Sequence, residues 1–196
     1  MKVKSRRSER HLRLWTVREF YRMGERGIFH PEERVELIEG VIYKMFRISP
    51  AHATVVQVSR DVLTAVFGQA CYVRTQFPLH LGPRSEPLAD VAVVAGSIRD
   101  YTEQHPTTAL LLVEVSDRTL RHDRHCKGGL YAKASIADFW ILNLKKRHLE
   151  VYRKPVANPD DDFGYRYEEV TILTDQDAVS PLACPASRIL VADLLP

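Results

Sequence analysis

Two acidic residues interrupt apolar segments that have the composition of buried strands. Asp90 begins the segment DVAVV, and Glu114 lies near the end of ALLLVEV. Glutamate is almost never fully buried without a partner. If these strands are antiparallel neighbours, the start of one lies beside the end of the other, and the two carboxylates meet. Two carboxylates at close range repel unless they are protonated or share a cation, and their oxygens favour Mg²⁺ or Mn²⁺.

A lysine follows the second acidic segment within one helix length. A helix predicted from about residue 123 to 134 turns one face toward the sheet, and that face carries Asp123, Lys127, Leu130, Tyr131 and Ala134. Lys127 therefore points inward, toward the end of the Glu114 strand. An ammonium, a divalent cation and two carboxylates together would bind a phosphodiester and its attacking water, because the metal acidifies water and the ammonium stabilises charge on phosphorus.

Each of these residues also has a purely structural interpretation. An aspartate such as Asp90 often caps a strand end, and a lysine such as Lys127 often reaches the surface along its apolar stem. The structural alternative for Glu114 is a buried ion pair with an arginine or with Lys127. His52, near a predicted helix start, is a general base, a phosphate contact or a capping-region histidine, and the sequence leaves this open.

Two other chemistries are suggested by residue type and disfavoured by spacing. His122, His125 and Cys126 are zinc-ligand types, but no second Cys/His pair completes a four-ligand site. Ser116, Asp117 and His122 are the types of a hydrolase triad, but there is no G-x-S-x-G turn and residues so close in sequence rarely reach triad geometry.

The elements that must position these residues fit one α/β domain over 16–196, with a mixed central sheet flanked by helices. Hydrophobic residues make up 45% and charged residues 27% of the 196 residues, which is typical of a folded soluble domain. We expect helices over 16–23, 49–66 and 123–134, and strands over 35–45 (two, with a turn at Glu39-Gly40), 71–81, 90–94, 109–115, 138–144, 149–153 and 165–173. Residues 155–163 are predicted to be a loop, and 187–195 a closing element.

Charge, cysteine content and hydropathy indicate the compartment and the partners of the protein. The net charge is +3. The excess of positive charge lies in a basic arm at residues 1–15, which contains Lys2, Lys4, Arg6, Arg7, Arg10 and Arg13. This arm is either a solvated terminus or a phosphate-binding segment. Three scattered cysteines favour a reducing compartment. The apolar runs are too short to cross a bilayer, and no signal peptide is visible. We therefore expect a cytoplasmic protein without a membrane partner.

The ordered set of motifs resembles the Uma-type family of bacterial endonucleases, within the PD-(D/E)XK or restriction-endonuclease-like superfamily. The resemblance covers about residues 16–154 and rests on six segments in the family's order: ELIEGVIYKM (36–45), His52, LADVAVV (88–94), LLVEVSDRT (111–119), DRHCKGGLYAKASIADFWILN (123–143) and LEVYR (149–153). Ala89 stands where the family motif has proline, and SDRT stands where it has SPST. Neither difference removes a ligand.

The resemblance implies a site as well as a fold. Asp90, Glu114 and the Val115 carbonyl would hold the metal, and Lys127 would be the lysine moved from the strand to the following helix, because position 116 is serine. Glu36 and His52 match the family's other polar positions and would lie at the rim of the site. Asp123 would orient Lys127 four residues away. The glycines after Lys127 would weaken that helix by about 1 kcal/mol each relative to alanine.

The sequence thus predicts an Mg²⁺- or Mn²⁺-dependent endonuclease acting on DNA and leaving a 5′-phosphate. A homodimer is expected, because cutting both strands is simplest with two sites related by a two-fold axis. The alternative is a non-catalytic nucleic-acid-binding or scaffold protein on the same fold.

Overall fold

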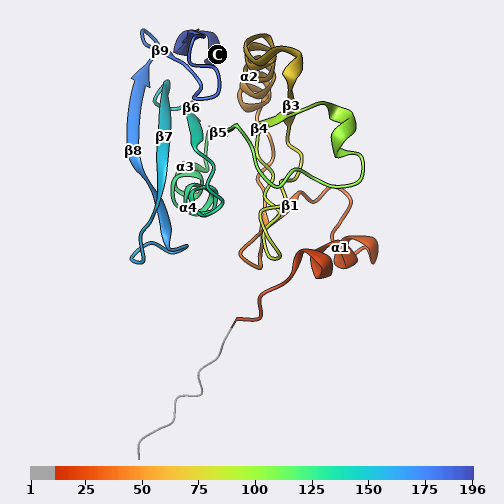
Figure 1. The fold of residues 1–196 in the computed structure, drawn as a ribbon. Coiled ribbons are helices and arrows are strands. Elements are labelled where there is room, and N and C mark those ends of the chain that lie inside the picture. The colour runs from red at the N-terminus through yellow and green to blue at the C-terminus, as the bar shows by residue number, and fades with distance from the viewer. Residues whose placement is uncertain (1–11) are drawn as a thin grey trace, which may run out of the picture.

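A six-stranded mixed sheet forms the centre of the protein in this computed structural model, which describes residues 12–196 (Figure 1). Adjacent strands are antiparallel except β5 and β6, which run parallel. The predicted fold class is therefore confirmed. In spatial order the strands are β3 (Cys71–Thr75), β4 (Val91–Ala95), β5 (Leu111–Ser116), β6 (Asp138–Asn143), β7 (His148–Ala157) and β8 (Tyr165–Thr174).

The two N-terminal helices predicted from the sequence begin at side-chain caps. In front of α1 (Val17–Glu25), the Thr16 hydroxyl accepts the Glu19 N–H at 3.3 Å, and the Glu19 carboxylate accepts the Thr16 N–H at 3.0 Å. Ser49 caps α2 (Pro50–Phe67), which has proline at its first position. Both caps satisfy donors that would otherwise lack a partner at a helix start. The basic residues at positions 2, 4, 6, 7 and 10 of the expected arm lie outside the described residues.

Side-chain alternation along the strands divides the core into two layers. On β5, Leu111, Val113 and Val115 pack in the layer covered by α2, whereas Leu112 packs in the layer covered by α4 (Gly128–Lys133). Because side chains alternate with a period of two, Glu114 shares the α4 side with Leu112. This face assignment brings Glu114 under the helical segment that carries the lysine.

The antiparallel register of β4 and β5 places the two acidic residues side by side. Val91 pairs with Val113. Continuing this register by one residue sets Asp90 opposite Glu114, as the sequence predicts. Both lie at one edge of the α4 layer, where the chain leaves β5.

The connection from β5 to β6 is helical but not one regular α-helix. It consists of α3 (Leu120–His122), a π-helical turn η3 (Asp123–Lys127) and α4. The Gly128 N–H bonds to the Asp123 carbonyl, an i to i+5 spacing. A Cβ at Gly129 would lie 2.6 Å from the Phe163 ring. Glycine there allows a close approach of the 158–164 loop, which is the physical reason for a residue with low helix propensity.

Two predicted boundaries differ from the structure. The strand expected over 71–81 ends at Thr75, because Gln76 adopts a left-handed backbone with φ of +55° and its N–H bonds to the Ala89 and Asp90 carbonyls. The loop expected over 155–163 begins later, since β7 extends to Ala157. The strand predicted over 165–173 is confirmed as β8, and it lies at an edge of the sheet.

The remaining elements surround this sheet. A hairpin of β1 (Val35–Ile38) and β2 (Val41–Lys44) turns at Glu39-Gly40 as predicted. The C-terminal segment forms the short pair β9 (Ala178–Val179) and β10 (Ile189–Leu190) and then η4 (Val191–Leu194), beside α2 (Figure 1). Within residues 12–196, no helix combines the length and apolar character needed to cross a bilayer.

Candidate active site

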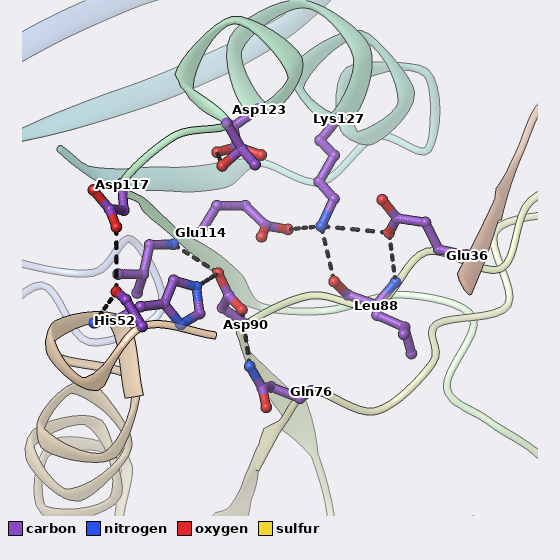
Figure 2. A network of polar contacts seen from close by, with 12 residues as sticks. Glu36, His52, Gln76, Leu88, Asp90, Glu114, Asp117, Asp123 and Lys127 are labelled. Carbon is purple, nitrogen blue, oxygen red and sulfur yellow. Dashed lines mark hydrogen bonds and ion pairs between the residues drawn. The ribbon is translucent and has the colours of Figure 1, made fainter. Parts of the chain in front are cut away.

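Asp90 directly precedes the first residue of β4, and three protein groups bind its carboxylate. Its Oδ2 accepts the Val115 N–H at 2.9 Å and lies 3.0 Å from Nε2 of His52. Its Oδ1 accepts only a longer bond of 3.3 Å from the Gln76 amide. Figure 2 shows His52 and Gln76 on two sides of the Asp90 carboxylate. Gln76 was not predicted, because it reaches Asp90 only through the backbone kink described above. Its sequence signal is no more than a glutamine after a strand.

Glu114 forms the buried ion pair that the sequence offers as one alternative, and its partner is Lys127. The Lys127 ammonium donates to Glu114 Oε1 at 3.0 Å and to the Leu88 carbonyl at 2.8 Å. The Tyr131 hydroxyl donates to the same Oε1 at 2.6 Å, a contact that sequence reasoning missed although it placed Tyr131 on the inward face. No hydrogen bond from residues 12–196 reaches Oε2, which leaves one oxygen of this carboxylate without a protein donor.

Glu36 joins the same network from β1. Its Oε2 accepts the Leu88 N–H at 3.1 Å and lies 3.4 Å from the Lys127 ammonium (Figure 2). Its Oε1 lies 3.4 Å from Nε2 of His122. The structure thus brings Asp90, Glu114, Lys127, Glu36 and His52 together, and their catalytic roles remain predictions. Glu36 is as deeply buried as the pair on the sheet rather than at the rim.

Burial and neighbouring charges shift the pKa values of Glu114 and Lys127 from their ordinary values. Burial raises the pKa of the Glu114 carboxyl well above its usual value, and the neighbouring Asp90 and Asp123 charges add to this against the opposing effect of Lys127. Burial alone would lower the pKa of Lys127, but the surrounding carboxylates, with Glu114 and Glu36 foremost, raise it above the ordinary lysine value. Lys127 is therefore a permanent cation among several acidic groups.

Asp90 stays ionised more readily than Glu114. Burial opposes its charge, but the His52 contact, Lys127 and the Val115 N–H lower its pKa below the usual range. Asp90 is therefore an ionised carboxylate, and the neighbouring Glu114 has one oxygen, Oε2, without a donor among the described residues. Together they offer oxygen atoms that can bind a cation.

Asp123 does not bond directly to Lys127, contrary to expectation. Its Oδ2 accepts the Thr119 hydroxyl at 2.6 Å, and no hydrogen bond between Asp123 and Lys127 occurs in the described part of the chain. The π-helical turn is the reason: residues four apart lie on one face of an α-helix, whereas the i to i+5 spacing here rotates them apart. Asp123 acts on the lysine through its charge alone.

Among the residues that the structure describes, neither the zinc site nor the hydrolase triad suggested by residue type is formed. His125 is exposed, whereas His122 lies against Glu36. Asp117 accepts a bond from Ser49 at 3.2 Å rather than facing a histidine. Within residues 12–196, no group of three or more His, Cys, Asp or Glu side chains is arranged to hold a metal ion. A metal here would therefore need ligands besides side chains.

A cleft of about 690 Å³ opens onto this network. Asp90, Glu114 and Lys127 line it, and they are at most 8% exposed as side chains. Its walls are the 43–49 segment before α2, the 117–127 segment after β5, and the tip of the 158–164 loop. The cleft is of the size that encloses small ligands, roughly 300–1,000 Å³.

A second ionic cluster anchors the turn that carries Lys127. Arg124, within η3, donates two bonds to the carboxylate of Glu150 on β7, at 2.8 and 2.6 Å. Glu150 also accepts from Tyr152 and Asn143 and lies 2.9 Å from His148. A bidentate arginine–carboxylate bond fixes geometry as well as adding energy. The π-helical turn is therefore tied to the sheet next to the lysine.

Replacing Glu150 by glutamine is expected to lower the free energy of unfolding at pH 7 by about 1.5–3 kcal/mol, the range for hydrogen bonds to a charged group, because the Arg124 side chain is 38% exposed. Burial opposes the charge of Glu150, but its donors, Arg124 first, hold its pKa at about 2 instead of 4.5. A lowered folded-state pKa stabilises the protein above pH 4.5, and this stabilisation is lost as the pH falls toward 2.

Urea unfolding of the wild type and Glu150→Gln at pH 7 and pH 3 measures this effect. The difference between the two proteins should shrink at pH 3. Glu168→Gln, at an exposed position of β8, is the matched control and should change stability at neither pH. An equal difference at both pH values would show that the charge of Glu150 does not matter.

Comparison with known proteins places this geometry in a family. A sequence profile of the Uma2 family, described as "Putative restriction endonuclease", matches residues 17–192. The chain belongs to the Uma2 family. The match spans α1 to η4 and so includes every element that contributes to the site of this Uma2 chain. The resemblance predicted from the six sequence segments is thereby confirmed.

A solved structure supports the fold of this Uma2 protein. The crystal structure of a putative nuclease belonging to DUF820 from Anabaena variabilis ATCC 29413 matches with a TM-score of 0.68. The match covers 91% of this chain and 96% of the other at 15% sequence identity. At that identity the likeness shows the fold alone. No curated protein matches the chain.

Proposed function

We propose that this chain is a divalent-metal-dependent DNA endonuclease that hydrolyses phosphodiester bonds. The observation that carries the proposal is the pair of buried carboxylates, Asp90 and Glu114, brought together on adjacent strands beside the buried Lys127 ammonium at the floor of a cleft. The family's description as a restriction endonuclease and the nuclease neighbour support the same class of activity.

The donor set fits Mg²⁺ or Mn²⁺. Asp90 and Glu114 each have an oxygen with a weak protein donor or none, and the Val115 carbonyl completes the protein ligands that we propose. Hard cations of this kind retain several waters and use few carboxylates, so three side-chain ligands are not required. When bound, such a cation supplies positive charge at a phosphate oxygen and acidifies water.

The chain's own residues have separate roles in the proposed reaction. A water oxygen forms a bond to phosphorus while the bond from phosphorus to O3′ breaks, so that the products carry a 5′-phosphate and a 3′-hydroxyl, and protons from the water end on these two products. His52 and the Val115 N–H hold Asp90 in place, and Tyr131 holds Glu114.

Lys127 supplies charge rather than a proton in this reaction, because its neighbours keep it cationic. Its three hydrogens already face Leu88, Glu114 and Glu36, the last at the longest distance, 3.4 Å. We propose that the contact to Glu36 is the one exchanged for a phosphate oxygen. Stabilising the charge that develops on phosphorus is worth most where the stabilising group is buried, as Lys127 is here.

A supercoiled-plasmid nicking assay tests the proposal. Purified protein with Mg²⁺ or Mn²⁺ should convert supercoiled to open-circular plasmid, EDTA should stop the conversion, and Lys127→Ala should reduce it to background. Identical background from wild type, Lys127→Ala and the EDTA sample would refute hydrolysis.

The competing function is a non-catalytic nucleic-acid-binding or scaffold protein on the same fold. Calorimetric titration with Mn²⁺ separates the two. Binding by the wild type that disappears in Asp90→Ala and Glu114→Ala supports the enzyme, and absence of binding supports the scaffold. We further propose a cytoplasmic homodimer, for which light scattering should give twice the chain mass; a strictly monomeric mass contradicts the dimer.

A further inference from the structure

The wall of the cleft formed by the 45–49 segment exposes apolar side chains to solvent. Phe46 is 66% exposed and Ile48 is 38% exposed, and both line the cleft together with Met45. Single exposed apolar residues are common, but two exposed side chains and the half-buried Met45 within four positions of one segment at the mouth of a site form a patch. The segment joins β2 to the Ser49 cap of α2, so both of its ends are fixed.

The same cleft carries arginines that have no acidic partner. The side chains of Arg34, Arg47, Arg118 and Arg121 line it, and none forms a salt bridge or hydrogen bond with any residue from 12 to 196. In contrast, the cationic groups of the site's interior, such as Lys127, are fully paired. Unpaired guanidinium groups around an acidic floor are placed to bind phosphates on either side of a scissile bond.

The depth and size of the cleft limit what can enter. Its floor is almost completely buried, and about 690 Å³ is the volume of a pocket for a small ligand. One or two nucleotides fill a space of this size, and a phosphodiester reaches the buried floor more readily when its nucleotides are unpaired and can turn into the cleft. A nucleotide that has left the stack exposes the face of its base, and an aromatic side chain provides the surface that replaces its neighbour.

We propose, on the basis of the nuclease function above, that the substrate enters this cleft as unpaired single-stranded nucleic acid, with a base stacked on Phe46 and flanking phosphates bound by the cleft arginines. The chemistry of the patch matches this one occupant: an aromatic ring for a base and cations for the backbone. Ile48 extends the apolar surface on the side of α2.

Binding can be measured without cleavage, in Ca²⁺ or EDTA, by fluorescence anisotropy with a labelled single strand and a hairpin duplex of the same length. The single strand should bind at least about 10-fold more tightly than the duplex. Phe46→Ala should weaken single-strand binding by about 5- to 150-fold, the range for loss of one base stacked on an aromatic ring, and leave duplex binding unchanged. Phe46→Tyr should retain the affinity.

Phe77→Ala is the matched control, because Phe77 is 51% exposed and does not line the cleft. A strand carrying the fluorescent base 2-aminopurine gives a second readout: its emission should be quenched by the wild type and not by Phe46→Ala. Arg47→Ala should reduce the salt dependence of single-strand binding by a slope of about 0.7, the value for one phosphate contact.

The outcomes separate the two proposals. Preferential single-strand binding and quenching without any nicking would leave this inference standing and refute the nuclease. Nicking with equal affinity for single strand and duplex, or with Phe46→Ala behaving like Phe77→Ala, would overturn the inference and leave the nuclease standing.

Discussion

Changing Asp90 to asparagine should abolish Mn²⁺ binding and reduce plasmid nicking by about 10²–10⁴-fold. The substitution keeps the size of the side chain and an oxygen for the Val115 N–H bond, but it removes the charge that we propose holds a cation beside Glu114. A bound cation supplies several kcal/mol of transition-state stabilisation, which corresponds to this range of rate. Calorimetry with Mn²⁺ and initial nicking rates measure the two effects.

Asp117→Asn is the matched control for this experiment. Asp117 also lines the cleft as a carboxylate, but it accepts a bond from Ser49 and has no contact with Glu114 or Lys127. Its loss should leave metal binding intact. If Asp90→Asn binds Mn²⁺ as the wild type does, the metal lies elsewhere and the assignment of Asp90 is wrong.

Replacing Lys127 by methionine should destabilise the protein by about 3–5 kcal/mol, in addition to stopping catalysis. Methionine has a similar unbranched stem, so the main change is the loss of the ammonium that neutralises Glu114 and Glu36. Removing one partner of a buried ion pair leaves the other charge buried without compensation, and this lowers the free energy of unfolding. For a chain of this size, the loss corresponds to a fall in Tm of roughly 6–20 °C.

A second variant isolates the cause of that loss. In the double variant Lys127→Met with Glu114→Gln, one of the two carboxylates that lost the ammonium is neutralised and only Glu36 keeps its charge, so the stability should recover by at least about 1 kcal/mol relative to Lys127→Met alone. Scanning calorimetry on the wild type, both single variants and the double variant completes the cycle. Strictly additive effects would show that Lys127 and Glu114 do not interact.

The part of the site that the sequence predicts is the part that follows from burial and alternation. Asp90 and Glu114 are anomalous in apolar segments, and an antiparallel pairing of those segments brings them together without further information. The lysine could be placed on the inward face because its neighbours Leu130 and Tyr131 are apolar or aromatic at helical spacing.

The remaining part depends on backbone geometry that has no pattern in the sequence. Gln76 reaches Asp90 because one residue adopts a left-handed φ, and a glutamine at that position gives no warning of it. The π-helical turn likewise depends on tertiary contacts, among them the bond from Arg124 to Glu150 on a strand that follows later in the chain. It is this turn that separates Asp123 from Lys127.

The network joins β1, the start of α2, two central strands and the segment after them, from Glu36 to Lys127. Such contacts between distant parts of a chain are expensive in loop entropy and form late in folding. The hydrolytic activity that we propose should therefore emerge only when the last tertiary contacts are made. A nascent or partly unfolded chain would be harmless to nucleic acid, which is a safeguard that requires no inhibitor.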